Sequence, residues 1–196
     1  MTHRKLLKKT MYKFAPLGAY KLNSPLISRI LISTIILYIL NFFINVKVLI
    51  FLIVAIITNA SMERFRLNTG GWPTDFELST FSTVLVTLAF GIKWGIVAAI
   101  FTKLITSIST GNVIPDHFFM IGTYILAAII TVIFGGSNVF LIGMIVTTIN
   151  CIIMFTLSKN VLGLPIHQNL SYTISNFIFN FIIFSILGQI VFKVLI

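Results

Sequence analysis

Long apolar stretches, separated by short polar ones, follow one another along most of the chain. Their spacing predicts helices at about 27–45, 47–61, 77–91, 94–110, 118–134, 138–158 and 170–195. The first two segments meet at Asn45, Val46 and Lys47, where neither proline nor glycine forces a turn. They are therefore either a hairpin of two short helices or one long helix that is tilted or bent.

The connections between the later segments are of two kinds. Long polar loops are expected at about 61–77, 110–117 and 158–170, and short glycine-rich turns at about 91–94 and 135–138. Because successive helices alternate in direction, the long loops share one face of the bundle and the tight turns share the other. With seven helices and a cytoplasmic N-terminus the long-loop face is cytoplasmic, and with six it lies outside.

Composition identifies the class of protein. Of 196 residues, 58% are hydrophobic and 9% charged, and the mean hydropathy is +1.07. Soluble domains carry about a quarter charged residues, and a spanning helix needs about 20 apolar residues. A chain this short cannot bury so many apolar helices on all sides. The expectation is an all-α, polytopic transmembrane bundle in the cell membrane: one domain over 25–196, with six core helices and with or without an extra N-terminal one.

The net charge of +10 is concentrated near the N-terminus. Its basic residues there, with no acid among them, are Arg4, Lys5, Lys8, Lys9, Lys13, Lys21 and Arg29. Leu7, Met11 and Phe14 lie opposite the lysines at helical spacing, which predicts that 1–24 is an amphipathic segment on anionic membrane lipids. It also predicts a cytoplasmic N-terminus. A nucleic-acid-binding arm would carry stacking aromatic residues and a glycine-rich motif, so nucleic acid is not an expected partner.

All four carboxylates of the chain lie between residues 63 and 116. Such clustering in an apolar protein predicts a polar site on one side of the membrane. The loop at 61–77 is the expected lid, in which Trp72 supplies an aromatic face, and Asp75 and Glu77 supply hydrogen-bond acceptors. A cationic or heterocyclic ligand would suit this set.

The same lid residues have simpler interpretations. Trp72 could sit at the membrane interface, and Asp75 or Glu77 could cap a helix start. Glu63 is expected to pair locally with Arg64 or Arg66, which contributes little if the pair is exposed.

Other candidate ligand contacts lie on the same face and on the later helices. They are Asn112, Asp116, His117, Asn150, Tyr172, Asn176 and Asn180. The last three recur every four residues and form a polar stripe, which either lines a cavity or bonds neighbouring helices. Asp116 could instead cap a helix after Pro115, and His117 could be interfacial.

Lys103 lies within an apolar segment, and an ionisable residue at such depth should face a cavity or extend its amine to the interface. The alternative is that it belongs to a helix-packing face with its neighbouring threonines and serines.

The chain offers no motif for catalysis or for a metal or cofactor. It has no paired nucleophile and base, no phosphate-binding glycine loop and no HExxH sequence, so we do not expect an enzyme. One histidine beside one aspartate is too small a set for a metal site. Cys151 is the single cysteine, which excludes disulfide frameworks.

The unit from Asp75 to Gly111 joins an acidic approach, an apolar helix, a turn formed by Phe90, Gly91, Lys93 and Gly95, and a helix ending in small and hydroxylated residues. It resembles the second and third helices of the substrate-binding S components of energy-coupling factor transporters. Three further helices follow in both cases, and the similarity covers about 47–196.

The resemblance implies a six-helix bundle that binds a vitamin or a metal ion near the outer face, with 61–77 as its lid. It implies ligand contacts from that loop, from 110–117 and from the last helices. A coupling membrane subunit and two ATPases would be the partners that drive import. The alanine-x-x-x-alanine contact of that family's first helix is absent, since Ala55 and Ala60 do not have this spacing.

A related pattern occurs in the rod-shape-determining MreD family, although an aspartate usual there corresponds to about Lys103 here. This resemblance implies a non-catalytic scaffold subunit of a cell-envelope complex. A ligand cavity under the long loops would favour the binding component. A scaffold would instead direct Asn176 and Asn180 towards partner helices and have no cavity.

Overall fold

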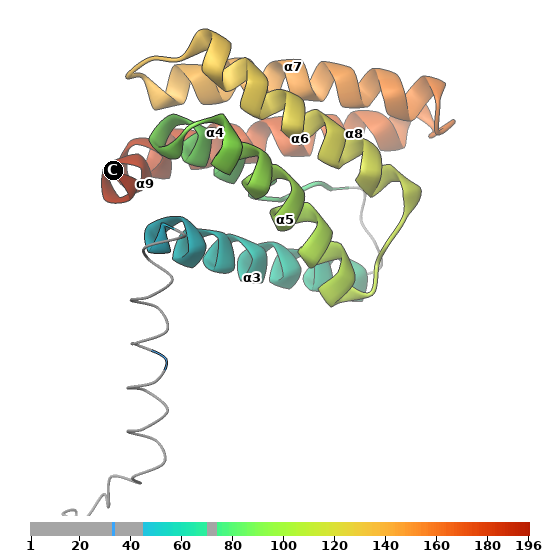
Figure 1. The fold of residues 1–196 in the computed structure, drawn as a ribbon. Helices are drawn as coiled ribbons and strands as arrows, with labels where there is room; N and C mark the ends of the chain where they lie inside the picture. The colour runs from blue at the N-terminus through green and yellow to red at the C-terminus, as the bar shows by residue number, and fades with distance from the viewer. Residues whose placement is uncertain (1–32, 34–44, 70–73) are drawn as a thin grey trace, which may run out of the picture. The chain divides into compact units, whose positions relative to one another are not determined.

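A computed structural model describes residue 33 and residues 45–69 and 74–196 of the chain (Figure 1). The residues from Ile44 to Ile196 form one compact unit, to which the following description applies. The predicted basic segment 1–24 and nearly all of the first apolar segment lie outside the described residues.

The described part of the chain is helical and contains no strand. Its elements are α3 (Val46–Asn68), α4 (Ser79–Phe90), α5 (Ile92–Thr110), α6 (Pro115–Phe134), α7 (Val139–Asn160), α8 (Ile166–Ile183), the π-helical turn η1 (Phe184–Gly188) and α9 (Gln189–Leu195). The last three form one continuous span of 30 residues, Ile166–Leu195. Together with α3, α5, α6 and α7 it makes five segments long and apolar enough to cross a membrane. The predicted all-α membrane bundle is confirmed.

The start of α3 agrees with the expectation, but its end does not. Asn45 has an extended backbone and its side chain accepts a hydrogen bond from the Lys47 amide at 3.0 Å, so this residue caps the start of α3. The helix runs on to Asn68, beyond the predicted end at about 61. The residues that follow Ala60 include Met, Glu and Arg, which favour helix, and no glycine before Gly70. The first half of the predicted lid is therefore helical.

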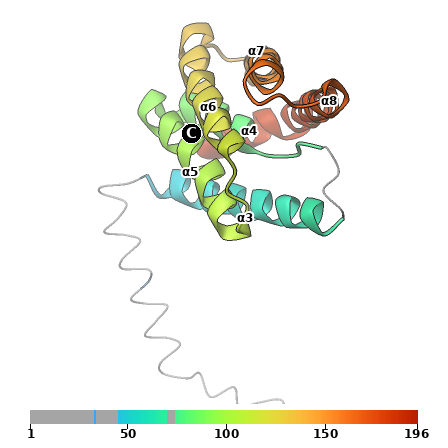
Figure 2. The same ribbon diagram turned by 90° about the vertical axis from the view of Figure 1, so that its right-hand side faces the viewer.

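The helix α4 is short and central. Its 12 residues extend about 18 Å, less than the roughly 30 Å hydrocarbon core of a membrane. It contacts every other helix of the unit, and lies between α3 on one side and α7 on the other (Figures 1 and 2). Every side chain from Ser79 to Thr87 is buried. The membrane-facing helices thus surround one that is shielded from lipid.

A non-helical segment leads into α4 and takes part in the bundle interior. The Leu78 amide donates to Asn59 Oδ1 on α3 at 2.6 Å, which satisfies a backbone group before the helix starts. Irregular backbone at membrane depth is tolerated where it is buried in protein or lines a cavity. Glu77, at 6% exposure, belongs to this segment.

Two helix contacts depend on glycine. A Cβ atom on Gly95 would lie 1.9 Å from Thr87 Oγ1, and one on Gly143 would lie 2.5 Å from the Phe184 ring. In the α4–α5 and α7–η1 contacts, a side chain of one element therefore packs directly against the glycine backbone of the other, as small residues commonly allow between membrane helices. The C-terminal ends of α3, α5 and α7 lie together at one end of the bundle, at the right in Figure 1, as the alternating direction of successive helices predicts.

Candidate functional site

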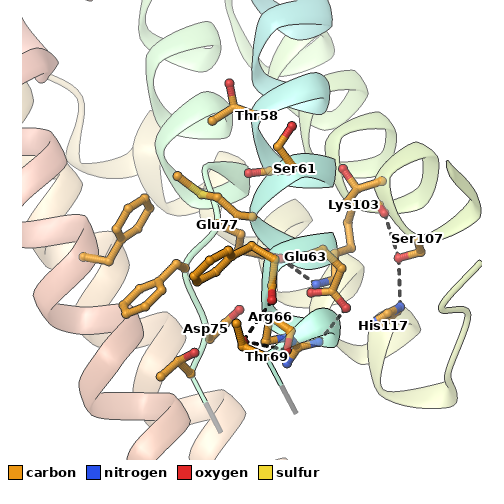
Figure 3. A pocket seen from close by; sticks show the side chains of 17 residues that line it. Thr58, Ser61, Glu63, Arg66, Thr69, Asp75, Glu77, Lys103, Ser107 and His117 are labelled. Carbon is orange, nitrogen blue, oxygen red and sulfur yellow. Dashed lines mark hydrogen bonds and ion pairs between the residues drawn. The ribbon is translucent and has the colours of Figure 1, made fainter. Parts of the chain in front are cut away.

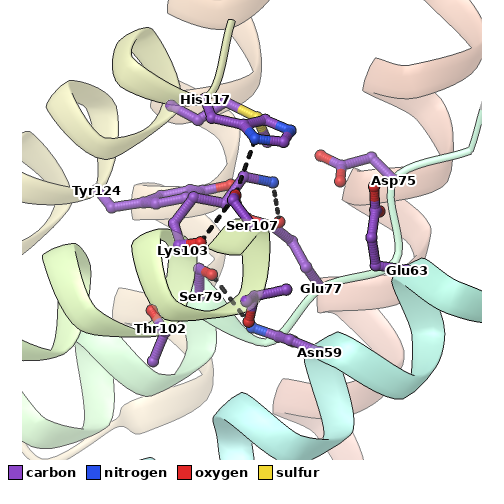
Figure 4. Close-up of polar contacts among 12 residues, drawn as sticks. Asn59, Glu63, Asp75, Glu77, Ser79, Thr102, Lys103, Ser107, His117 and Tyr124 are labelled. Carbon is purple, nitrogen blue, oxygen red and sulfur yellow. Dashed lines mark hydrogen bonds and ion pairs between the residues drawn. The ribbon is translucent and has the colours of Figure 1, made fainter. Parts of the chain in front are cut away.

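A buried ion pair lies at the centre of the polar interior. Lys103 Nζ on α5 donates to Glu77 Oε2 at 2.5 Å, and the Tyr124 hydroxyl on α6 donates to the other oxygen, Oε1 (Figure 4). Lys103 is 5% exposed, so its amine does not extend to the interface. A charge is stable at this depth only when paired and hydrogen-bonded. Glu77 therefore fixes the segment before α4 to two other helices.

Asp75 connects the same segment to α8. Its Oδ2 atom accepts from Asn176 Nδ2 at 2.9 Å, and its amide donates to Ser175 Oγ at 2.9 Å. Burial of the carboxyl, reinforced by the nearby charge of Glu77, raises the pKa of Asp75 to about 7, against the opposing effect of Lys103 and Arg66.

A second ion pair lies at the end of α3. Arg66 donates to Glu63 Oε1 at 2.6 Å, and Asn112 Nδ2 donates to the same oxygen at 2.5 Å. The pair is partly buried, with side-chain exposures of 22% for Arg66 and 15% for Glu63. Arg64 instead donates to the Ser109 carbonyl at 3.1 Å. The predicted local ion pair therefore forms between Glu63 and Arg66, and the fold places it partly buried against the site.

His117 and Ser107 form a third contact, between α6 and α5. His117 Nδ1 lies 2.8 Å from Ser107 Oγ, and Ser107 Oγ also donates to the Lys103 carbonyl at 2.9 Å. The Ser107 hydroxyl therefore lies within hydrogen-bond distance of both the His117 ring and the backbone of its own helix.

Two adjoining cavities lie among these groups. The larger has a volume of about 830 Å³ and the smaller about 120 Å³. Arg66, Asp75, Lys103 and His117 line both of them. Figure 3 shows the polar lining of the larger cavity, contributed by α3, α5, α6 and the segment before α4. Its apolar lining includes Met62, Phe65, Phe76 and Phe179.

Most of the predicted site residues that the structure describes line one of these cavities. Glu77 lines the larger cavity; Asp116, Asn150, Tyr172 and Asn176 line the smaller; and Asp75 and His117 line both. Trp72 lies outside the described residues.

Two predicted site residues line neither cavity. Asn112 lies outside both cavities and donates a hydrogen bond to Glu63, which lines the larger one. Asn180 is fully buried, and its Nδ2 donates to the Asn176 carbonyl on the same helix at 3.0 Å. Because α8 packs on α7, this part of its polar stripe faces protein instead of open space.

None of the three acidic residues Asp75, Glu77 and Asp116 occupies an N-cap position, although Asp116 does lie at a helix start. The N-cap position of α4 is Leu78 and that of α6 is Ile114, and neither cap makes a side-chain hydrogen bond. Asp116 lies in the first turn of α6, where its Oδ1 is buried without a partner.

The structure also brings in residues that the sequence did not single out as site residues. Lys103 stood out as a lysine in an apolar segment, but its partner could not be identified. Tyr124, one of many aromatic residues in apolar helices, gave no signal. Asn150, by contrast, was a predicted site residue, and it both lines a cavity and bonds a neighbouring helix: its Nδ2 donates to Thr80 Oγ1 on α4 at 3.3 Å.

The arrangement is suited to recognising a ligand. It offers donors, acceptors and an apolar wall, while within the described residues no three of His, Cys, Asp and Glu come together to hold a metal ion. Comparison with known proteins adds no identity, since no family model, curated protein or solved structure matches the chain.

Proposed function

We propose that this multi-pass membrane protein is a binding component for the uptake of a small organic molecule across the cell membrane, similar to a transporter S component. The observation that carries this proposal is the cavity of about 830 Å³ lined by polar side chains inside an apolar bundle. Ligand sites typically measure about 300–1,000 Å³, with mostly apolar walls and a few convergent polar groups.

The polar side chains favour a binding component over an MreD-like scaffold. Asn176 Nδ2 donates to Asp75, and Asn180 Nδ2 donates to Asn176, so the NH2 groups of both amides are engaged within the chain. A scaffold would need these groups for partner helices. The cavity lies by the long connections, which is where a binding component would place it.

An organic ligand is favoured over a metal ion. A metal site would require converging ligands of suitable type at about 2–2.6 Å from the ion. The larger cavity instead has an apolar wall that includes Phe65, Phe76 and Phe179. Such a wall suits a ligand with a carbon skeleton.

Energy for uptake would come from partner proteins. The chain has no glycine-rich phosphate-binding loop of its own. The resemblance to S components suggests a coupling membrane subunit and two ATPases, and our proposal includes them.

Affinity purification of the tagged protein from its native membrane, followed by mass spectrometry, tests the proposal. We expect two ATPases and a membrane subunit to co-purify, and to be absent when an unrelated tagged membrane protein is used. Recovery of cell-envelope assembly proteins without an ATPase would support the scaffold instead.

A further inference from the structure

Acidic side chains outnumber basic ones around the two cavities. The cavities are lined by four carboxylates and two cations: Glu63, Asp75, Glu77, Asp116, Arg66 and Lys103. Arg66 pairs with Glu63 at 2.6 Å and Lys103 with Glu77 at 2.5 Å. Within the described residues, Asp75 and Asp116 have no ion-pair partner. Two negative charges therefore remain when both carboxylates are ionised.

The smaller cavity contains two unpaired hydrogen-bond acceptors. Asp116 Oδ1 and Asn150 Oδ1 are buried and have no hydrogen-bond partner, and both residues line this cavity. Asn150 is 6% exposed and Asp75 lines the same space. Buried polar atoms are rarely left unpaired, so two unpaired acceptors beside one cavity favour a donor within it, from water or from a ligand. The donors that this set lacks could come from a bound ligand.

The two cavities differ in character. The smaller, at about 120 Å³, has room for roughly four waters at about 30 Å³ each, or for the head group of an organic molecule. The larger has an aromatic wall, where the centroids of the Phe76 and Phe179 rings lie 5.6 Å apart. Asp75 borders both cavities.

We propose that the ligand of this site is an organic cation, whose ammonium or amidinium group binds Asp75, Asp116 and the Asn150 carbonyl. Its apolar body occupies the larger cavity against Phe76 and Phe179. This inference rests on the proposed binding function and specifies its substrate class.

The arrangement of cations supports this choice over an anion. Both Arg66 and Lys103 are already neutralised by a carboxylate within 2.6 Å, so neither offers an unpaired positive charge to an anionic ligand. Arg66 Nε is buried without a partner, and a neutral carbonyl or hydroxyl oxygen of the ligand could accept from it.

Three probes of similar size test the charge requirement on the full chain in lipid nanodiscs: 2-phenylethylammonium, 2-phenylethanol and 3-phenylpropanoate. Calorimetry gives their affinities, and mass spectrometry identifies any small molecule retained during purification. We expect the ammonium probe to bind at least tenfold more tightly than the other two, and any retained molecule to be cationic. This ranking needs only the wild-type protein.

Variants locate the cation. Asp75→Asn and Asp116→Asn should each weaken binding of the ammonium probe at least tenfold, whereas Lys93→Gln, an exposed change at the opposite tight turn, should not. If the alcohol or the carboxylate bound as tightly as the ammonium probe or more tightly, the proposal of a cationic ligand would be refuted, but the proposed binding function would not. Unchanged affinity in both Asp variants would likewise overturn the assignment.

Two further results have separate meanings. Stabilisation by Na⁺ alone that is lost in Asp116→Asn, with no preference for the ammonium probe, would assign the smaller cavity to an inorganic cation and refute an organic one. If no probe binds and no small molecule is retained, the proposed binding function fails together with this inference.

Discussion

The Lys103–Glu77 pair offers the sharpest test of the interior that we describe. Lys103→Met removes the charge and keeps an apolar stem, while Glu77→Gln removes the charge and keeps a carbonyl acceptor for Tyr124. The two single variants and the double variant form a cycle that isolates the charge interaction.

The expected magnitudes follow from the geometry. At 2.5 Å the attraction is about 7 kcal/mol for an effective dielectric constant of about 20, and desolvation of both groups offsets much of it. Removing one partner leaves an unpaired buried charge, so each single variant should lose about 3–5 kcal/mol of unfolding free energy. The double variant leaves no such charge and should lie within about 2 kcal/mol of wild type.

Equilibrium unfolding of the purified protein in mixed detergent micelles, followed by circular dichroism, measures these free energies. Lys93→Gln, on the exposed turn, is the matched control and should change stability by less than about 0.5 kcal/mol. Our reasoning would be refuted if Lys103→Met left stability unchanged, or if the loss in the double variant equalled the sum of the single losses.

Three further predictions concern titration, packing and the segment before α4. Because the pKa of Asp75 is about 7 in the folded protein against an ordinary 3.8, the native state holds a proton that the unfolded chain releases. The stabilisation that comes from protonated Asp75 should therefore be complete below about pH 4 and be lost as pH rises to about 7. Asp75→Asn should flatten this part of a profile of melting temperature against pH. Gly143→Ala should cost about 1–3 kcal/mol because its methyl group would meet the Phe184 ring, whereas Gly122→Ala, with open space around it, should not destabilise in the same unfolding assay. Asn59→Leu should lower stability by about 1–3 kcal/mol by leaving the partly buried Leu78 amide unpaired, and a melt no different from wild type would contradict this role.

The sequence by itself determined the class of the protein and most of its helices. Membrane helices carry their signal locally, as a run of apolar residues long enough to span lipid, and glycines mark where such runs end. The predicted segments at about 94–110, 118–134 and 138–158 correspond to α5, α6 and α7 within a few residues. Clustering of carboxylates between residues 63 and 116 also indicated which end of the bundle carries the polar interior.

The tertiary structure alone decided which polar groups meet. Glu77 lies 26 residues from Lys103 and 47 from Tyr124, and nothing local in the sequence relates them. Their contact depends on how closely α4, α5 and α6 approach one another, which is set by glycine contacts such as that of Gly95 with Thr87. The same dependence explains why Asn176 reaches a cavity and Asn180, one turn further along α8, does not. Periodicity places a residue on a face of its helix, but only the packing of the other helices determines whether that face borders protein, lipid or a cavity.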